Sequence, residues 1–403
     1  MGWAVSNIAG DPREPVQLTR RDFFAAAFLA SFALQRGDAR FLGVVPLGPP
    51  GNRTRLERLL GKGLDARLFT DLSTLGSAPA LRNSQSAFVT PNDRFFVRTA
   101  CPSAVTQTDA WTIRLGGGDG SATVDLRSLA ALTVPGPRCL MECSGNVDQS
   151  NFGLMSTADW EGVPLAAVLD RARPTVPTSN VLVAGVDDEA SPARTSVPGA
   201  SWIFASGDLD RALLATRMNG APLPRDHGAP VRLLVPGWYG CACIKWVNRI
   251  EFVADDAPAT SQMLEFAART HQPFGPVRAP GPGEAPTLAR DFMPAIIDTA
   301  AMPVRVEKWR AGNRIEYRIT GIIWGGVKPT NALSIRFKSG GAWTRVENCP
   351  LPQSTLTWSL WTHTWRPETP GKYEIVLRVD DPSIRTRRLD IFFYVREITI
   401  DDV

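Results

Sequence analysis

The sequence has no block of one charge and almost no long hydrophobic run. The net charge is only +4 over 403 residues, and no cluster of lysine and arginine with interleaved aromatic residues occurs. Apart from the apolar run Ala25–Leu34, no stretch approaches the roughly 20 apolar residues that a membrane helix needs. We therefore expect a mature protein that is soluble, has no stable membrane anchor and does not bind nucleic acid.

Cysteine and histidine are scarce. Six cysteines in a chain of this length do not form a disulfide framework, and no Cys-x-x-Cys-His haem attachment signal occurs. Four of them form two tight groups, Cys139 with Cys143 and Cys241 with Cys243. A four-thiolate zinc site is possible, but these spacings differ from those of structural zinc knuckles. Cys139, Cys241 and Cys243 could pair in an oxidising compartment, and we favour reduced thiols in the core.

Glycine (34) and proline (33) are abundant and predict many turns in a largely β chain. The length predicts two or three domains. From about residue 291, short alternating segments separated by turns favour a β-sandwich of immunoglobulin type. The predicted strands are Ile315–Ile322, Ala332–Phe337, Trp343–Val346, Thr355–Trp365, Gly371–Val379 and Arg388–Val395. Residues 254–290 read as a connector of low order.

The N-terminus resembles an export signal. Arg20 and Arg21 precede the apolar run Ala25–Leu34, as in a twin-arginine signal. The alternative is a basic turn that leads into an ordinary amphipathic helix, but the run is apolar on all sides. We expect residues 1–40 to be signal and leader, and the protein to be periplasmic.

The stretch from Cys139 to Asn146 carries the clearest chemical signal. Cys143 precedes Ser-Gly-Asn146, where the chain must turn, so its thiol is expected at the end of a strand and facing a pocket. Such a thiolate can bind a soft or high-valent metal. From spacing alone, a small buried hydrophobic residue is the commoner alternative.

A second group of polar residues lies further along. His227 sits in a turn rich in proline and glycine between Arg225 and Arg232, a set of donors that suits a phosphate. Asp187 and Asp188 close a predicted strand over Val181–Val186, where a carboxylate can face a ligand or cap a turn.

Six short segments occur in a fixed order, and together they resemble the sulfite oxidase family of molybdenum enzymes. The resemblance covers nearly the whole mature chain. The segments are Thr90-Pro-Asn with Phe95-Phe-Val-Arg98, Glu142-Cys-Ser-Gly-Asn146, Ser156-Thr-Ala-Asp-Trp-Glu-Gly-Val-Pro164, Met218-Asn-Gly with Leu223-Pro-Arg-Asp-His-Gly228, Val235-Pro-Gly237 with Ile244-Lys-Trp246, and Trp358-Ser-Leu-Trp361.

The resemblance implies an α+β protein with a mixed α/β molybdopterin-binding domain over residues 41–290 and an immunoglobulin-like dimerisation domain over 291–403. It implies one Mo-molybdopterin per chain, with Cys143 as the thiolate ligand of molybdenum and Arg98 near the reacting face of the metal. The other residues implied to hold the cofactor are Phe96, Val97, Asp187, His227, Arg232, Cys243, Ile244 and Lys245. The implied chemistry is oxo-atom transfer to or from a small substrate, with electrons passed to a separate acceptor such as a c-type cytochrome.

The departures from the family pattern fall at the implied sulfite pocket. Val147 replaces an arginine, Phe266 falls at the position of a tyrosine, and Thr99-Ala100 replaces Asn-His. A terminal-domain arginine has no counterpart unless Arg385, Arg387 or Arg388 substitutes. A small dianion needs converging donors, so these departures leave the substrate open. Three hypotheses remain: an oxidase of sulfite or a related compound, a reductase of sulfoxide-like substrates, and a binding protein without turnover.

Overall fold

The computed structural model describes residues 39–48, 72, 89–103, 105–106, 109–117, 120–146, 153–172, 179–188, 200–270, 287–337, 341–391 and 394–403. The segment 1–38, which holds the predicted export signal, lies outside these residues, as does Val147. Within the described residues the chain is mostly β with a few short helices, which confirms the α+β expectation in coarse form. None of the described helices is long and apolar enough to cross a membrane.

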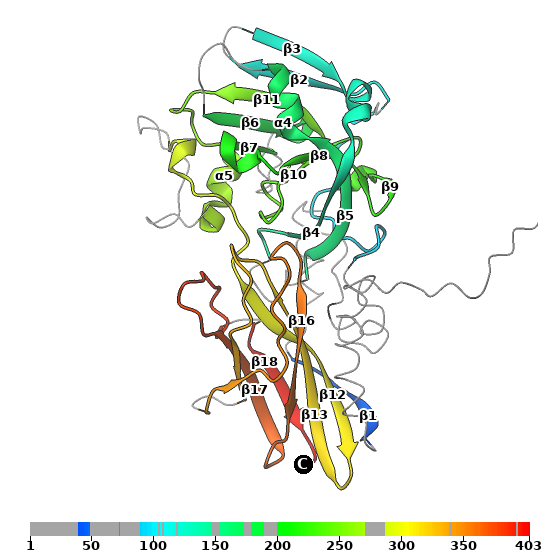
Figure 1. Cartoon of the computed structure of the whole chain (residues 1–403), viewed down its shortest axis with the longest axis vertical. Coiled ribbons are helices and arrows are strands. Elements are labelled where there is room, and N and C mark those ends of the chain that lie inside the picture. Colours follow the sequence, from blue (N-terminus) through cyan, green and yellow to red (C-terminus); the bar gives the residue numbers. More distant parts are fainter. Residues whose placement is uncertain are drawn as a thin grey trace, which may run out of the picture.

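Two five-stranded sheets form the part of the molecule drawn in cyan and green in Figure 1. The first has the order β3-β2-β11-β6-β7, in which β11 runs parallel to β2 and antiparallel to β6. Its strands are β2 (Thr112–Gly117), β3 (Gly120–Asp125), β6 (Asn180–Gly185), β7 (Ser201–Ala205) and β11 (Val247–Val253). The second has the order β10-β8-β5-β4, with β9 paired to β8. Its strands are β4 (Val134–Glu142), β5 (Met155–Pro164), β8 (Leu213–Met218), β9 (Ala221–Pro222) and β10 (Arg232–Leu234).

The helices of this part are short. Among them are a 3-10 helix η3 (Leu126–Leu132), and α4 (Leu165–Leu169) followed by η4 (Asp170–Ala172). Residues 254–270 and 287–290 are more ordered than the connector we expected, because they contain α5 (Ser261–Glu265), η8 (Ala267–Thr270) and the start of η9 (Ala289–Asp291). The Thr260 hydroxyl caps α5 by accepting a hydrogen bond from the Met263 N–H. The remaining 3-10 turns are η5 (Val186–Asp188), η6 (Ser206–Leu209) and η7 (Arg225–His227).

Two four-stranded sheets form the C-terminal part, with the orders β1-β12-β13-β16 and β15-β14-β17-β18. Their strands are β1 (Ala39–Val45), β12 (Ala300–Ala311), β13 (Arg314–Trp324), β14 (Leu333–Arg336), β15 (Thr344–Arg345), β16 (Ser359–Trp365), β17 (Gly371–Val379) and β18 (Arg396–Ile400). Alternating burial along β18 and the buried side chains of β13 show how these strands enclose a core containing Tyr317, Trp324 and Trp361.

One of the sequence predictions for this part is wrong. Residues 388–395 contain no strand among those the structure describes, and β18 begins only at Arg396. β1, from the N-terminal end of the described chain, pairs along β12 in the C-terminal sheet.

The end of β4 meets the C-terminal part of the chain. The Leu140 N–H donates to the Leu356 carbonyl at 2.6 Å, and the Tyr239 N–H donates to the Ala295 carbonyl at 2.9 Å. In Figure 1, β4 lies at the boundary between the upper sheets and the C-terminal sheets. The residues that follow β4 are therefore positioned by both parts.

Candidate molybdopterin site

An open cavity of about 860 Å³, including the solvent at its mouth, collects residues from widely separated segments. It brings together nine of the ten residues predicted for the cofactor. They are Phe96, Arg98, Cys143, Asp187, His227, Arg232, Cys243, Ile244 and Lys245. Val97 is the exception: it is buried and does not line the cavity.

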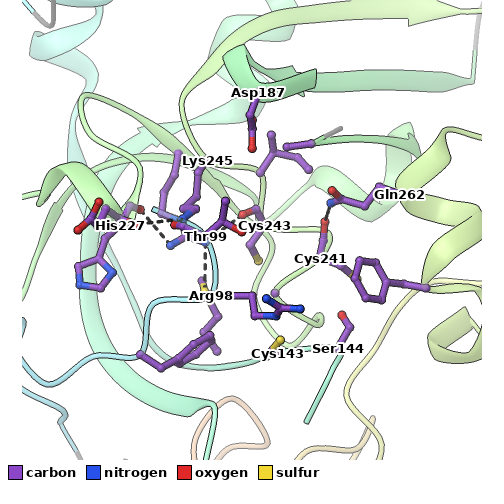
Figure 2. A pocket seen from close by; sticks show the side chains of 18 of the residues that line it. Arg98, Thr99, Cys143, Ser144, Asp187, His227, Cys241, Cys243, Lys245 and Gln262 are labelled. Carbon is purple, nitrogen blue, oxygen red and sulfur yellow. Dashed lines mark hydrogen bonds between the residues drawn. The ribbon is translucent and has the colours of Figure 1, made fainter. Parts of the chain in front are cut away.

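Cys143 lies at one end of the cavity, directly after the last residue of β4. Its Sγ accepts a hydrogen bond from the Gly145 N–H at 3.3 Å, and its own N–H donates to the Leu154 carbonyl at 2.9 Å. Figure 2 shows the Arg98 guanidinium and the Ser144 side chain beside this thiol. Burial raises the pKa of Cys143, and the charge of Arg98 opposes that rise. A metal cation binding there would displace the proton and be held by the thiolate.

Arg232 and His227 form a second group of donors. Arg232 is only 3% exposed, and its guanidinium donates to the carbonyls of His227 (3.0 Å) and Cys243 (2.9 Å). Burial lowers the pKa of Arg232 to about 10. The His227 Nε2 donates to the Asn92 carbonyl at 3.2 Å, because a carbonyl can only accept, and this assigns the hydrogen of the neutral ring to Nε2.

Lys245 lies beside the second group, away from Cys143, and Figure 2 shows Asp187 above it. Its ammonium donates to the carbonyls of Thr99 and Asp226, the latter at 2.9 Å. Burial and the charge of Arg232 lower the pKa of Lys245 to about 7, while Asp187 and Asp226 oppose the shift. The cavity thus has a thiol with one arginine at one end and a cationic group at the other.

The backbone is shaped to leave this cavity open. Gly228 has a φ of +111°, and a Cβ there would come within 2.9 Å of the Arg232 Cβ and 3.1 Å of the Lys245 Cβ. A Cβ at Gly240, which also lines the cavity, would lie 3.2 Å from the Glu142 carbonyl oxygen. Larger side chains at these positions would push the lining residues out of place.

The residues predicted for the substrate pocket do not all lie at the cavity. Phe266 lines the cavity, as the residue count predicted. Arg385 and Arg388 are exposed, Arg388 pairs with Asp390 at 2.8 Å, and Arg387 binds the buried Glu142 instead. None of these three arginines lines the cavity.

Sequence reasoning missed several lining residues, among them Ser144, Cys241 and Gln262. The Gln262 amide donates to the Cys241 carbonyl, which fixes α5 against the loop that carries Cys241. Ser144 adjoins Cys143, and its position alone could have suggested it. Gln262 gave no signal, because a single amide in a short helix has no recognisable pattern.

The zinc alternative finds no support in the geometry. Cys139, Cys143, Cys241 and Cys243 are all free thiols, and the described residues contain no group of three or more potential metal ligands of the His, Cys, Asp and Glu types. The thiol of Cys143 is therefore available as a single ligand.

Comparisons with known proteins agree with this geometry. Residues 99–261 match the model of the oxidoreductase molybdopterin binding domain. Sulfite oxidase of Gallus gallus is 28% identical over 331 residues, which cover 73% of this chain and 67% of the relative. The inducible nitrate reductase [NADH] 1 of Glycine max is 32% identical over 197 residues, covering 43% of this chain and 22% of the relative. The crystal structure of the sulfane dehydrogenase SoxCD from Paracoccus pantotrophus has a TM-score of 0.57 at 15% identity, covering 100% of this chain and 97% of that one, and shows a shared fold.

The fold and the site together define a molybdopterin-dependent oxidoreductase. Within that class, the chain is similar to sulfite oxidase over 73% of its length. Its cofactor is Mo-molybdopterin, and the chain is an enzyme.

The residues present fit this cofactor. Two buried guanidinium atoms, Nη1 of Arg98 and Nε of Arg232, have no hydrogen-bond partner in the described protein. Buried donors of this kind call for an acceptor, and the phosphate and oxo oxygens of the cofactor are acceptors. Cys143 supplies the soft ligand.

Proposed function

We propose that this enzyme transfers an oxo group between its molybdenum centre and a small substrate, sulfite or a related compound, and passes electrons to a separate acceptor. The observation that carries the proposal is the cavity with Cys143 and Arg98 at one end and Arg232 and Lys245 at the other. This arrangement suits a long anionic cofactor whose metal end meets the substrate.

The roles of the protein residues follow from their positions. The bound cofactor supplies the redox chemistry of the oxo transfer. Cys143 holds its metal end, while Arg232, Lys245 and His227 are placed to bind its phosphate end. Arg98 faces the thiol and is placed to attract and orient a substrate oxygen, and one such donor contributes about a hundredfold or more in rate.

The substrate class is narrowed by what surrounds Cys143. Arg98 is the single cationic side chain at that end of the cavity among the described lining residues, and Phe266 offers an apolar ring. A substrate with less charge than sulfite would suit such a pocket, and this supports a second candidate: a sulfoxide-type reductase, or an oxidase of a non-sulfite compound. The similarity to a nitrate reductase and to the fold of a sulfane dehydrogenase is compatible with this candidate.

The cofactor and substrate proposals are tested on one set of samples. Molybdenum and pterin are measured in the purified protein and in Cys143→Ser, and sulfite-dependent ferricyanide reduction is assayed on both. We expect one molybdenum per chain in the wild type and loss of turnover in the variant. Molybdenum without sulfite turnover would move the assay to sulfoxides and other oxo donors, whereas full turnover in Cys143→Ser would refute the ligand assignment.

We also propose the context in which the enzyme works. The pattern of Arg20, Arg21 and Ala25–Leu34 supports export by the twin-arginine route to the periplasm. The two C-terminal sheets support an immunoglobulin-like unit that mediates a homodimer, and the redox chemistry of an oxo transfer calls for an electron-transfer partner such as a c-type cytochrome. Sedimentation of the loaded protein tests the dimer, and reduction of added cytochrome c tests the acceptor.

A further inference from the structure

The carboxylate of Glu142 is buried directly beside Cys143 and is held from the C-terminal part of the chain. Its residue is 0% exposed. Oε1 accepts from Arg387 Nη1 at 2.7 Å, and Oε2 accepts from Arg387 Nη2 at 2.7 Å. The Trp324 indole donates to Oε2 at 2.9 Å, and the Asn146 amide donates to Oε1 at 2.8 Å. Four donors converge on one carboxylate, so an ionised glutamate is the side chain that fits this place.

Arg387 is itself held by several contacts. Its side chain is 7% exposed, and Nη1 also donates to the Tyr394 hydroxyl at 2.8 Å. Its guanidinium carbon lies 5.4 Å from the centre of the Tyr239 ring and 5.7 Å from that of Trp324. A planar guanidinium between aromatic rings has little freedom to move, so its position fixes that of Glu142.

The residue on the other side of Cys143 is held in a similar way. Nε and Nη2 of Arg269 donate to the Ser144 carbonyl at 2.9 and 2.8 Å. The Arg269 guanidinium carbon also lies 4.7 Å from the centre of the Tyr239 ring, so this one ring contacts both arginines. Both neighbours of Cys143 are thus tied to arginines from other segments of the chain.

The two arginines and the tryptophan that hold Glu142 and Ser144 lie outside the part of the chain that matches the molybdopterin domain. That match ends at residue 261, before Arg269, Trp324 and Arg387. We propose that Arg387 is a positioning residue for the molybdenum ligand: through Glu142 it sets where the Cys143 thiolate stands, so the C-terminal part of the chain completes the metal site. This inference rests on Cys143 as the metal ligand.

The test compares Arg387→Met with two matched variants. Glu316→Gln removes a buried carboxylate of the same part of the molecule, paired with Arg318 at 2.7 Å and Arg366 at 2.8 Å. Glu316 lies eight residues before Trp324 on β13, or about 26 Å along an extended strand. The double variant Glu142→Met/Arg387→Met removes both charges. No carboxylate is then left buried without a partner, while the hydrogen bonds between the two side chains are still missing.

Two readouts distinguish positioning from stability. In loaded protein, the EPR spectrum of Mo(V) reports the ligand geometry. In cofactor-free protein, mass spectrometry follows the rate at which iodoacetamide alkylates Cys143. We expect Arg387→Met and the double variant to shift the Mo(V) spectrum and to raise the alkylation rate at least about fivefold, because the loop opens locally more often. Glu316→Gln should lower the melting temperature and leave both readouts at their wild-type values.

A wild-type Mo(V) spectrum in Arg387→Met overturns the proposal, whatever the stability of that variant. If Arg387→Met does not fold, Arg387→Lys carries the same test, since it keeps the charge but cannot form two parallel hydrogen bonds. Failure of the underlying ligand assignment is separate, because it would appear as an unchanged Mo(V) spectrum in Cys143→Ser.

Discussion

At the scale of single residues, the site contains a buried arginine that donates to uncharged acceptors. Among the described residues, Arg232 donates to carbonyl oxygens and to the Met141 sulfur rather than to a carboxylate. Burying a cation in this way is costly unless an anion completes the site. The cofactor's phosphate would supply that anion. The buried cation therefore favours binding of the anionic cofactor by the cofactor-free protein.

His227 makes this preference measurable through pH. Burial and the charge of Arg232 lower the pKa of His227 from its ordinary 6.5 to about 4. Below pH 6.5 the unfolded chain binds a proton that the folded, cofactor-free protein does not, so the free energy of unfolding falls as the pH drops from about 6.5 to about 4. The loss should be on the order of 2 kcal/mol.

The measurement is urea unfolding of cofactor-free protein at pH 7 and pH 4.5, for the wild type and His227→Gln. Other groups titrate in both proteins, so the difference between the two pH dependences isolates His227. We expect the variant to lose less stability on acidification than the wild type. Equal losses in the two proteins would show that His227 does not carry this effect.

At the scale of elements, the sequence predicted strands where a short apolar run is bounded by turn residues. The bounds of β6 (Asn180–Gly185) differ by one residue at each end from the predicted strand Val181–Val186. β12 was missed because its first residues are buried on both faces, its later ones are mostly half-buried without alternation, and its register shifts between Pro303 and Arg305. Residues 388–395 were taken for a strand because they contain several apolar residues, yet Leu389 and Tyr394 are buried there outside any strand.

Close packing between β13 and its neighbours gives an element-scale prediction. A Cβ at Gly321 would lie 2.0 Å from Cζ2 of Trp361 on β16 and 2.5 Å from the Met302 carbonyl oxygen on β12. Gly321→Ala should therefore lower the free energy of unfolding by about 1–3 kcal/mol. Gly207→Ala is the control, because a Cβ there meets nothing within 4 Å. Denaturant unfolding of both variants checks this, and equal stabilities would show that the strands yield at this point.

At the scale of the whole molecule, the sequence predicted which residues gather at the site but not what holds them there. The gathering of Arg98, Cys143, Arg232 and Lys245 followed from an ordered set of short segments. The pairing of Glu142 with Arg387 joins residues 245 positions apart and leaves no local pattern. Interactions of that separation are fixed by how the two parts of the chain pack, which periodicity and spacing do not encode.

The packing of the two parts predicts how the molecule unfolds. The Glu142–Arg387 pair and the Leu140–Leu356 hydrogen bond join the end of β4 to the C-terminal sheets. Since the metal ligand Cys143 lies at this junction, unfolding of one part of the chain should expose the contacting surface of the other part to solvent. We expect scanning calorimetry to show a single transition for the loaded enzyme. Removing the cofactor should lower its midpoint by several degrees, because a ligand that binds only the folded state stabilises it, and should leave one transition. Two transitions in the loaded wild type, with the cofactor affecting only the first, would show instead that the C-terminal sheets fold independently of the site.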